Sequence, residues 1–167
     1  MFKRIILLIL IIFAFKGCTK DDICPGGTAT TPNLVITFND IANPLIRKKV
    51  EVLTVLTDNI DSVAVMKLVS TDSIIVPLNT NADTTKYLFI RSFISEAGTV
   101  DSINIDKLKF VYSRKNGYVN RACGFKTEFD NLKANLENEG TKNWIEQVNI
   151  KRETVNDENS AHLTVLH

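Results

Sequence analysis

Three cysteines are the residues of this chain whose type and spacing could do chemistry. Cys18 and Cys24 lie six positions apart in the stretch FKGCTKDDIC, and Cys123 follows far downstream. Such a set can be a redox pair, a metal site or cysteines with unrelated roles. A structural metal site needs further soft ligands at short spacing, and the sequence has none near either end of the set. We therefore expect no metal and no other cofactor.

The residues before Cys18 predict export. Lys3 and Arg4 precede an unbroken apolar run from Ile5 to Phe15. A membrane-spanning helix needs about 20 residues, so this run has instead the length of a signal-peptide core. The alternative, a buried N-terminal helix, is disfavoured because the run has no polar face.

The stretch FKGC at residues 15–18 resembles a bacterial lipobox, in which diacylglycerol is attached to the cysteine and the peptide is cut before it. The resemblance implies that residues 1–17 are a lipoprotein signal peptide and that the lipid on Cys18 anchors the protein in a membrane. Several acyl chains anchor a protein stably in a bilayer, whereas a single chain gives only reversible binding. Plain secretion is the alternative.

Three charged residues that follow Cys18 and Thr19 suggest a destination. Lys20, Asp21 and Asp22 resemble the short lysine-plus-acidic signal that sends lipoproteins of the Bacteroidetes to the outer face of the outer membrane. The alternative is an ordinary solvated tether. We expect an outer-membrane lipoprotein of the cell envelope, exposed at the cell surface.

With Cys18 acylated, Cys24 and Cys123 are the two cysteines that remain. An exported protein folds in an oxidising compartment, so these two are expected to form a disulfide. The loop that it closes would contribute roughly 4–5 kcal/mol in the chain-entropy model.

Composition limits the other functions. The chain has 20 basic and 19 acidic residues, and removal of residues 1–17 takes away three basic ones. The mature chain is therefore slightly acidic, whereas a nucleic-acid-binding domain is basic. We expect no nucleic-acid partner. Its length suits one domain with a substantial core.

Alternating apolar and polar residues predict an all-β domain. After a Pro-, Gly- and Thr-rich tether and linker at 18–32, apolar residues fall on one face at Leu34, Ile36 and Phe38. Residues 84–94 are apolar on both faces, which indicates a central strand, and Pro77 indicates a strand end or edge. About eight or nine such strands over residues 33–167 predict an immunoglobulin-like or related antiparallel β-sandwich.

Two local patterns refine this prediction. Asn116-Gly117 is a strong hairpin signal, with a returning strand at 118–125. Residues 128–138 could form one short helix, because Phe129, Leu132 and Leu136 have helix-like spacing.

Arg121 is the candidate site residue of this region. It shares strand parity with Cys123 and Phe125, so an inward-facing Cys123 would place Arg121 in partly buried surroundings. A buried arginine needs a carboxylate or carbonyl partner. We interpret it as a structural ion pair, with a ligand-binding arginine as the alternative.

Two other sets of polar residues resemble metal ligands, and we expect neither to bind a metal ion. His162 and His167 differ by an odd number of positions, so within one strand they face opposite sides, and both are expected at the surface. Asn79, Asn81 and Asp83 alternate like calcium ligands, but the glycine and closing glutamate of an EF-hand loop are missing. We expect a polar loop there.

The mature chain as a whole resembles a family of small, uncharacterised lipoproteins from flavobacteria and relatives. The matching stretches are CTKDDIC at 18–24, VPLNTNADTTKYLF at 76–89, LKFVYSRKNGYVNRACGFKTEF at 108–129 and the closing AHLTVLH. The block Arg121-Ala122-Cys123-Gly124 is the most specific of them. The family carries a domain of unknown function, so the resemblance implies location and framework and supplies no catalytic residues.

We expect a non-enzymatic envelope lipoprotein, a β-sandwich module that binds or supports another envelope protein or a glycan. The sequence shows no Ser nucleophile elbow, HExxH or P-loop. The alternatives are a secreted hydrolase-like enzyme, which would have a deep polar pocket, and a small-ligand carrier with an internal apolar cavity.

Overall fold

The computed structural model describes residues 23–95 and 98–167 and divides the chain into two compact units. The larger unit consists of residues 31–116 and 127–167, and the smaller one includes the N-terminal residues up to Thr30 and Gly117–Lys126. Cys18, Lys20, Asp21, Asp22 and the expected signal peptide lie outside the described residues. Within the described ranges, no helix combines the length and apolarity needed to cross a membrane.

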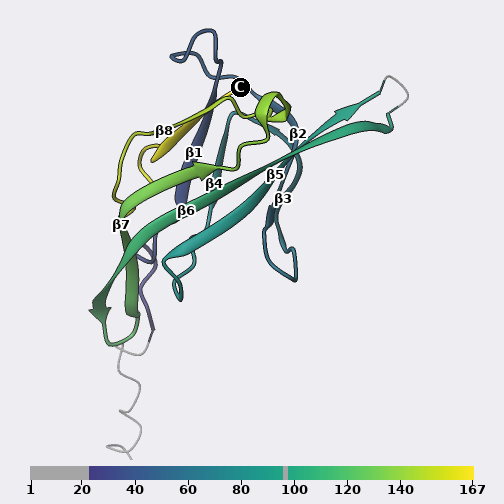
Figure 1. Ribbon diagram of the computed structural model, residues 1–167. Coiled ribbons are helices and arrows are strands. Elements are labelled where there is room, and N and C mark those ends of the chain that lie inside the picture. Colours follow the sequence, from purple (N-terminus) through teal and green to yellow (C-terminus); the bar gives the residue numbers. More distant parts are fainter. Residues whose placement is uncertain (1–22, 96–97) are drawn as a thin grey trace, which may run out of the picture. The chain divides into compact units, whose positions relative to one another are not determined.

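Nine strands and a single 3-10 turn make up the regular structure of the described chain (Figure 1). The strands are β1 (Leu34–Asn39), β2 (Val50–Thr57), β3 (Ala64–Thr71), β4 (Ser73–Val76), β5 (Thr84–Ile94), β6 (Val100–Asn120), β7 (Gly124–Leu136), β8 (Gln147–Ile150) and β9 (Leu163–Leu166); the 3-10 turn is η2 (Gly140–Lys142). The predicted all-β class is confirmed.

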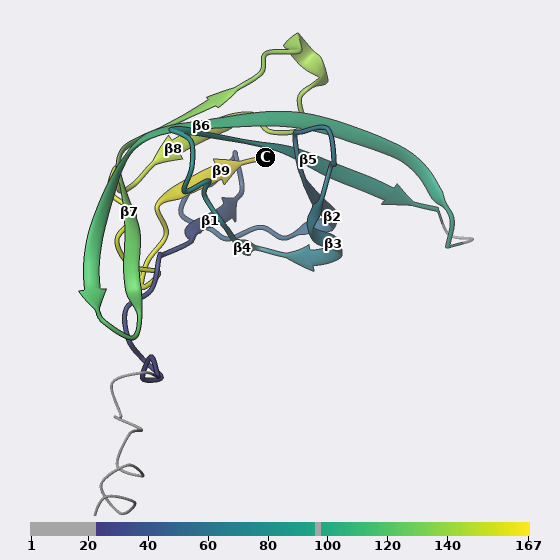
Figure 2. The same ribbon diagram turned by 90° about the horizontal axis from the view of Figure 1, so that it is seen from below.

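The larger unit is a sandwich of two sheets. One sheet has the order β4-β1-β9-β8 and the other the order β3-β2-β5-β6-β7. Figure 2 shows β1, β4 and β9 on one side of the long, curved strands β5 and β6. β5 is the central strand of its sheet and β4 is an edge strand, as their sequences predict.

Within these antiparallel-rich sheets, one pairing between described strands is parallel. β1 pairs parallel with β9, with Ile36 opposite Leu163, and antiparallel with β4. The hydroxyls of Thr37 and Thr164 lie 2.9 Å apart between β1 and β9. The two ends of the larger unit's sequence are therefore joined in the middle of one sheet.

The inner faces of both sheets form one hydrophobic core. Successive side chains of a strand point to opposite faces, and the alternate residues Leu34, Ile36 and Phe38 of β1 are all fully buried. The opposing sheet contributes completely or almost completely buried side chains, among them Leu53, Val55, Tyr87, Phe89, Leu108, Phe110, Phe129 and Leu132. Burial of one such side chain contributes roughly 1.5–3 kcal/mol.

The short helix predicted at 128–138 is wrong, because these residues begin within strand β7 and no helix is described there. Phe129 and Leu132 are both buried although they are three positions apart. Between them, Asn131 has a φ of 56°, and the residue count between inward-facing side chains increases by one. Such a β-bulge changes a spacing of two into three, which resembles a helical pattern in the sequence.

The hairpin predicted at Asn116-Gly117 is also wrong. Strand β6 continues through both residues to Asn120, and the chain turns at 121–123. Two features favour the actual turn: the backbone N–H of Cys123 donates to Asn120 Oδ1 at 2.7 Å, and Gly124 has a φ of 69°. That φ is disfavoured for residues with a Cβ.

Substitutions at Asn131 test the bulge. Asn131→Ala should lower the free energy of unfolding by about 1 kcal/mol relative to Asn131→Gly, because alanine is strained in the left-handed region and glycine is not. Both variants lose the weak 3.4 Å hydrogen bond to Ser113, so the comparison isolates the backbone. Urea unfolding with the disulfide intact measures the difference, and equal stabilities would contradict the bulge.

Candidate functional site

The predicted disulfide between Cys24 and Cys123 is present in the smaller unit. The Cα atoms of the two cysteines are 4.8 Å apart, and 99 positions separate them in the sequence. Cys123 belongs to the turn between β6 and β7, and Cys24 follows the first described residue, Ile23. The N-terminal segment is thereby cross-linked to the tip of the β6–β7 hairpin.

Arg121 is exposed, so the partly buried surroundings predicted for this residue are wrong. The prediction assumed a strand from 118 to 125, whereas residues 121–123 form the turn and Arg121 is exposed. Strand parity with Cys123 does not apply inside a turn. The guanidinium is instead available to solvent at the hairpin tip.

The hairpin tip also carries exposed aromatic rings. Tyr118 and Phe125 are 64% and 73% exposed, and their ring centroids lie 5.4 Å apart in an edge-to-face arrangement. Edge-to-face packing is a favourable geometry for aromatic rings. Two large apolar groups thus stabilise each other while most of their surface stays in water.

Both histidines are buried, contrary to the surface positions predicted for them. His162 is fully buried and His167 is 6% exposed. The Nδ1 atom of His162 accepts a hydrogen bond from the backbone N–H of Val35 at 3.0 Å, and the His167 ring packs at right angles to the rings of Phe38 and Trp144. The parallel pairing of β1 with β9, which sequence periodicity does not reveal, places them inside.

The loop with calcium-like spacing is held by an arginine. Arg114 donates to the Asp83 carboxylate at 2.6 Å and to the carbonyl oxygen of Thr80 at 2.9 Å. Asn79 Oδ1 accepts from the backbone N–H of Asn81 at 2.8 Å. Among the residues of the described ranges, no group of acidic, histidine or cysteine side chains could hold a metal ion.

A buried carboxylate organises the chain between β7 and β8. Asp106 is fully buried on β6, and its Oδ2 accepts from the backbone N–H of Ile145 at 2.7 Å. The neighbouring Trp144 donates from its indole nitrogen to the carbonyl oxygen of Phe89 at 3.1 Å. Burial raises the pKa of Asp106. These bonds fix Trp144 and Ile145 against the core, so we assign Asp106 a structural role.

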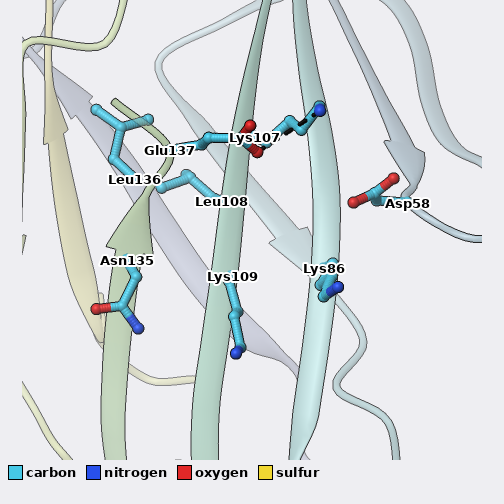
Figure 3. Close-up of a pocket in the computed structure, with 8 residues that line it drawn as sticks. All are labelled: Asp58, Lys86, Lys107, Leu108, Lys109, Asn135, Leu136 and Glu137. Atoms are coloured by element: carbon cyan, nitrogen blue, oxygen red, sulfur yellow. Dashed lines mark ion pairs between the residues drawn. The ribbon is translucent and has the colours of Figure 1, made fainter. Parts of the chain in front are cut away.

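A surface groove with three lysines is the strongest candidate for ligand binding in the larger unit. It has a volume of about 220 Å³ and is formed by Asp58, Lys86, Lys107, Leu108, Lys109, Asn135, Leu136 and Glu137 (Figure 3). Leu108 and Tyr87 are buried, so the lysines that neighbour them along β5 and β6 point away from the core.

Two of the lysines directly oppose each other. Lys86 of β5 is the register partner of Lys109 of β6, and like charges in directly opposite positions destabilise a sheet. Lys107 differs, because its Nζ lies 3.5 Å from Glu137 Oε2. The ion pairs found among the described residues include neither Lys86 nor Lys109.

Sequence reasoning missed this groove. Lys107 and Lys109 alternate around Leu108, which already indicates one basic strand face. The third lysine lies more than 20 positions earlier, and only the register between β5 and β6 brings it opposite Lys109.

Because His162 is buried, we expect the folded state to lose stability in acid. Burial, and secondly the charge of Arg152, lower its pKa below the ordinary value of 6.5. A histidine with a lowered pKa stabilises the folded state above pH 6.5, and this contribution is lost as the pH falls toward the folded pKa. His162→Asn keeps an acceptor for Val35 and removes the titration, so its melting temperature should fall less steeply below about pH 6.5. An unchanged slope would contradict this assignment.

Comparison with known proteins gives a family but no activity. The model of a family of unknown function, DUF6452, matches residues 52–167. No curated protein and no solved structure matches the chain. The match begins in β2 and extends to the last residue, so it includes the lysine groove, Cys123 and both histidines. This chain therefore belongs to the family of unknown function DUF6452.

Proposed function

We propose that this protein is a lipid-anchored module of the cell envelope that binds an envelope component and does not catalyse a reaction. The observation that carries the proposal is the Cys24–Cys123 disulfide. Structural disulfides persist in oxidising compartments, which supports export. The bond also accounts for two of the three cysteines and leaves Cys18, three positions after the end of the apolar run, for lipid attachment.

The groove supports an anionic ligand for this module. Its lysines lie on two adjacent strands, and the Lys86–Lys109 arrangement is unfavourable in the absence of a counter-charge. A phosphate or carboxylate group between the two ammonium groups would relieve that repulsion. Envelope glycans that carry such groups are partners with suitable chemistry. The ion-pair lysine, Lys107, then lines the groove without offering a free charge.

Lipid attachment is tested by metabolic labelling. The full-length chain is produced in a Gram-negative host with a palmitate analogue, and the label is expected on the wild type and absent from Cys18→Ala. The membrane fraction should contain the wild type, since acyl chains supply the affinity. Mass spectrometry without reduction should still give the Cys24–Cys123 peptide. Absence of label on the wild type would contradict the anchor.

Charge reversal at Lys109 tests the groove. Lys109→Glu replaces a like-charge pair with an opposite-charge pair, so the protein should become more stable by roughly 0.2–1 kcal/mol. The same variant should lose binding of tripolyphosphate, measured by calorimetry at low salt, where screening is weak.

Lys67→Glu provides the control for that variant. Lys67 is exposed on β3 and lies outside the groove, so the substitution makes the same change in net charge at a different place. Binding that survives Lys109→Glu, or is lost equally in both variants, would reject the groove as the binding site.

A further inference from the structure

We propose that the tip of the β6–β7 hairpin is a membrane-contact surface, which inserts aromatic side chains between lipid headgroups next to the anchor. This tip surface is defined as Ile23, Tyr118, Arg121 and Phe125, all in the smaller unit. The inference rests on the lipid anchor proposed above and adds a second point of contact with the same bilayer.

The first argument is exposure. Ile23, Tyr118 and Phe125 are 78%, 64% and 73% exposed, and none of the smaller unit's described residues is classed as buried. Apolar surface gains stability when it leaves water. The smaller unit offers these side chains no interior of its own, whereas the interfacial region of a bilayer does.

The second argument is chemical. Tyrosine is enriched at membrane interfaces because its ring is apolar and its hydroxyl can stay hydrated. The Tyr118 and Phe125 rings form one edge-to-face unit with centroids 5.4 Å apart, so they present a joined apolar surface. Arg121, exposed in the same turn, supplies a positive charge for anionic headgroups.

The third argument is distance. The disulfide ties the turn to Cys24, and six residue steps separate Cys24 from Cys18. A fully extended chain of that length spans about 20 Å. The tip therefore stays near the headgroups whenever Cys18 carries lipid, and contact becomes an intramolecular event with a high effective concentration. Even a weak affinity for the interface is then sufficient.

The competing occupant of this surface is a protein partner. The cross-link favours lipid, since it holds the tip where lipid is always within reach, and a partner protein would have to enter the same space. An experiment that reads the immediate surroundings of the tip separates the two.

Phe125→Trp provides the probe, and Ile60→Trp is the matched control. Ile60 is fully exposed in the larger unit between β2 and β3, so an indole there reports on ordinary surface. The native Trp144 is buried and gives a background measured on the wild type. Full-length lipidated protein is incorporated into vesicles of phosphatidylcholine and phosphatidylglycerol with bromine on the acyl chains.

The expected result is a several-fold larger loss of emission for Phe125→Trp than for Ile60→Trp, with weaker quenching of the former by aqueous iodide. Equal quenching at both positions by the brominated lipid would overturn the contact. Protection of the Phe125→Trp indole from both quenchers would indicate a protein cover and would also overturn it.

Vesicle flotation separates this inference from the anchor. Wild-type chain that floats with the vesicles while the Phe125→Trp indole remains unquenched retains the anchor and rejects the tip contact. A wild-type chain that does not float rejects the anchor, and the tip contact with it.

Discussion

Strand β1 is the constraint on which the four-stranded sheet depends. It pairs with β4 on one side and with β9 on the other, and its inward residues Leu34, Ile36 and Phe38 are fully buried. Without β1, the edge strand β4 would have no neighbour in its sheet. The parallel partner β9 lies more than 120 residues away in the sequence, so this sheet closes a long loop when it forms. Strand pairing over such a long sequence separation is intrinsically slow to form, because the loop must be closed before the contacts stabilise it.

The sequence predicts those elements whose side-chain period is undisturbed. In β1 the apolar residues Leu34, Ile36 and Phe38 stand at every second position and are all fully buried, and this alternation identifies the strand. It fails in β7, because one left-handed residue, Asn131, adds a residue between two buried side chains. The Asn116-Gly117 dipeptide also misplaces the hairpin, because Asn-Gly permits a turn without requiring one. The chain reverses instead at 121–123, where Asn120 accepts a hydrogen bond from the backbone of Cys123 and Gly124 adopts a positive φ.

The same distinction separates the sites that were predicted from those that were missed. The Cys24–Cys123 disulfide follows from counting cysteines in a chain whose sequence predicts export, and no geometry is needed. The lysine groove needs the pairing of Lys86 with Lys109, and the burial of His162 needs the neighbouring β1. Arg121 was misplaced for a related reason, since strand parity was extended through a turn. The number of cysteines thus predicts the disulfide, whereas the groove and the buried histidine depend on how the strands pair.

The N-terminal segment connects the proposed anchor to the folded domain. The family match begins at Val52, yet residues before it supply β1 and Cys24. With Cys18 in the membrane as proposed, any pull on the domain enters through Cys24. There the covalent path divides: one branch runs along residues 25–33 into β1, and the other crosses the disulfide into the β6–β7 hairpin. Because the disulfide carries part of the force to the hairpin, β1 does not bear the whole pull at its N-terminal end. The disulfide therefore fits a tethered protein better than a freely diffusing one.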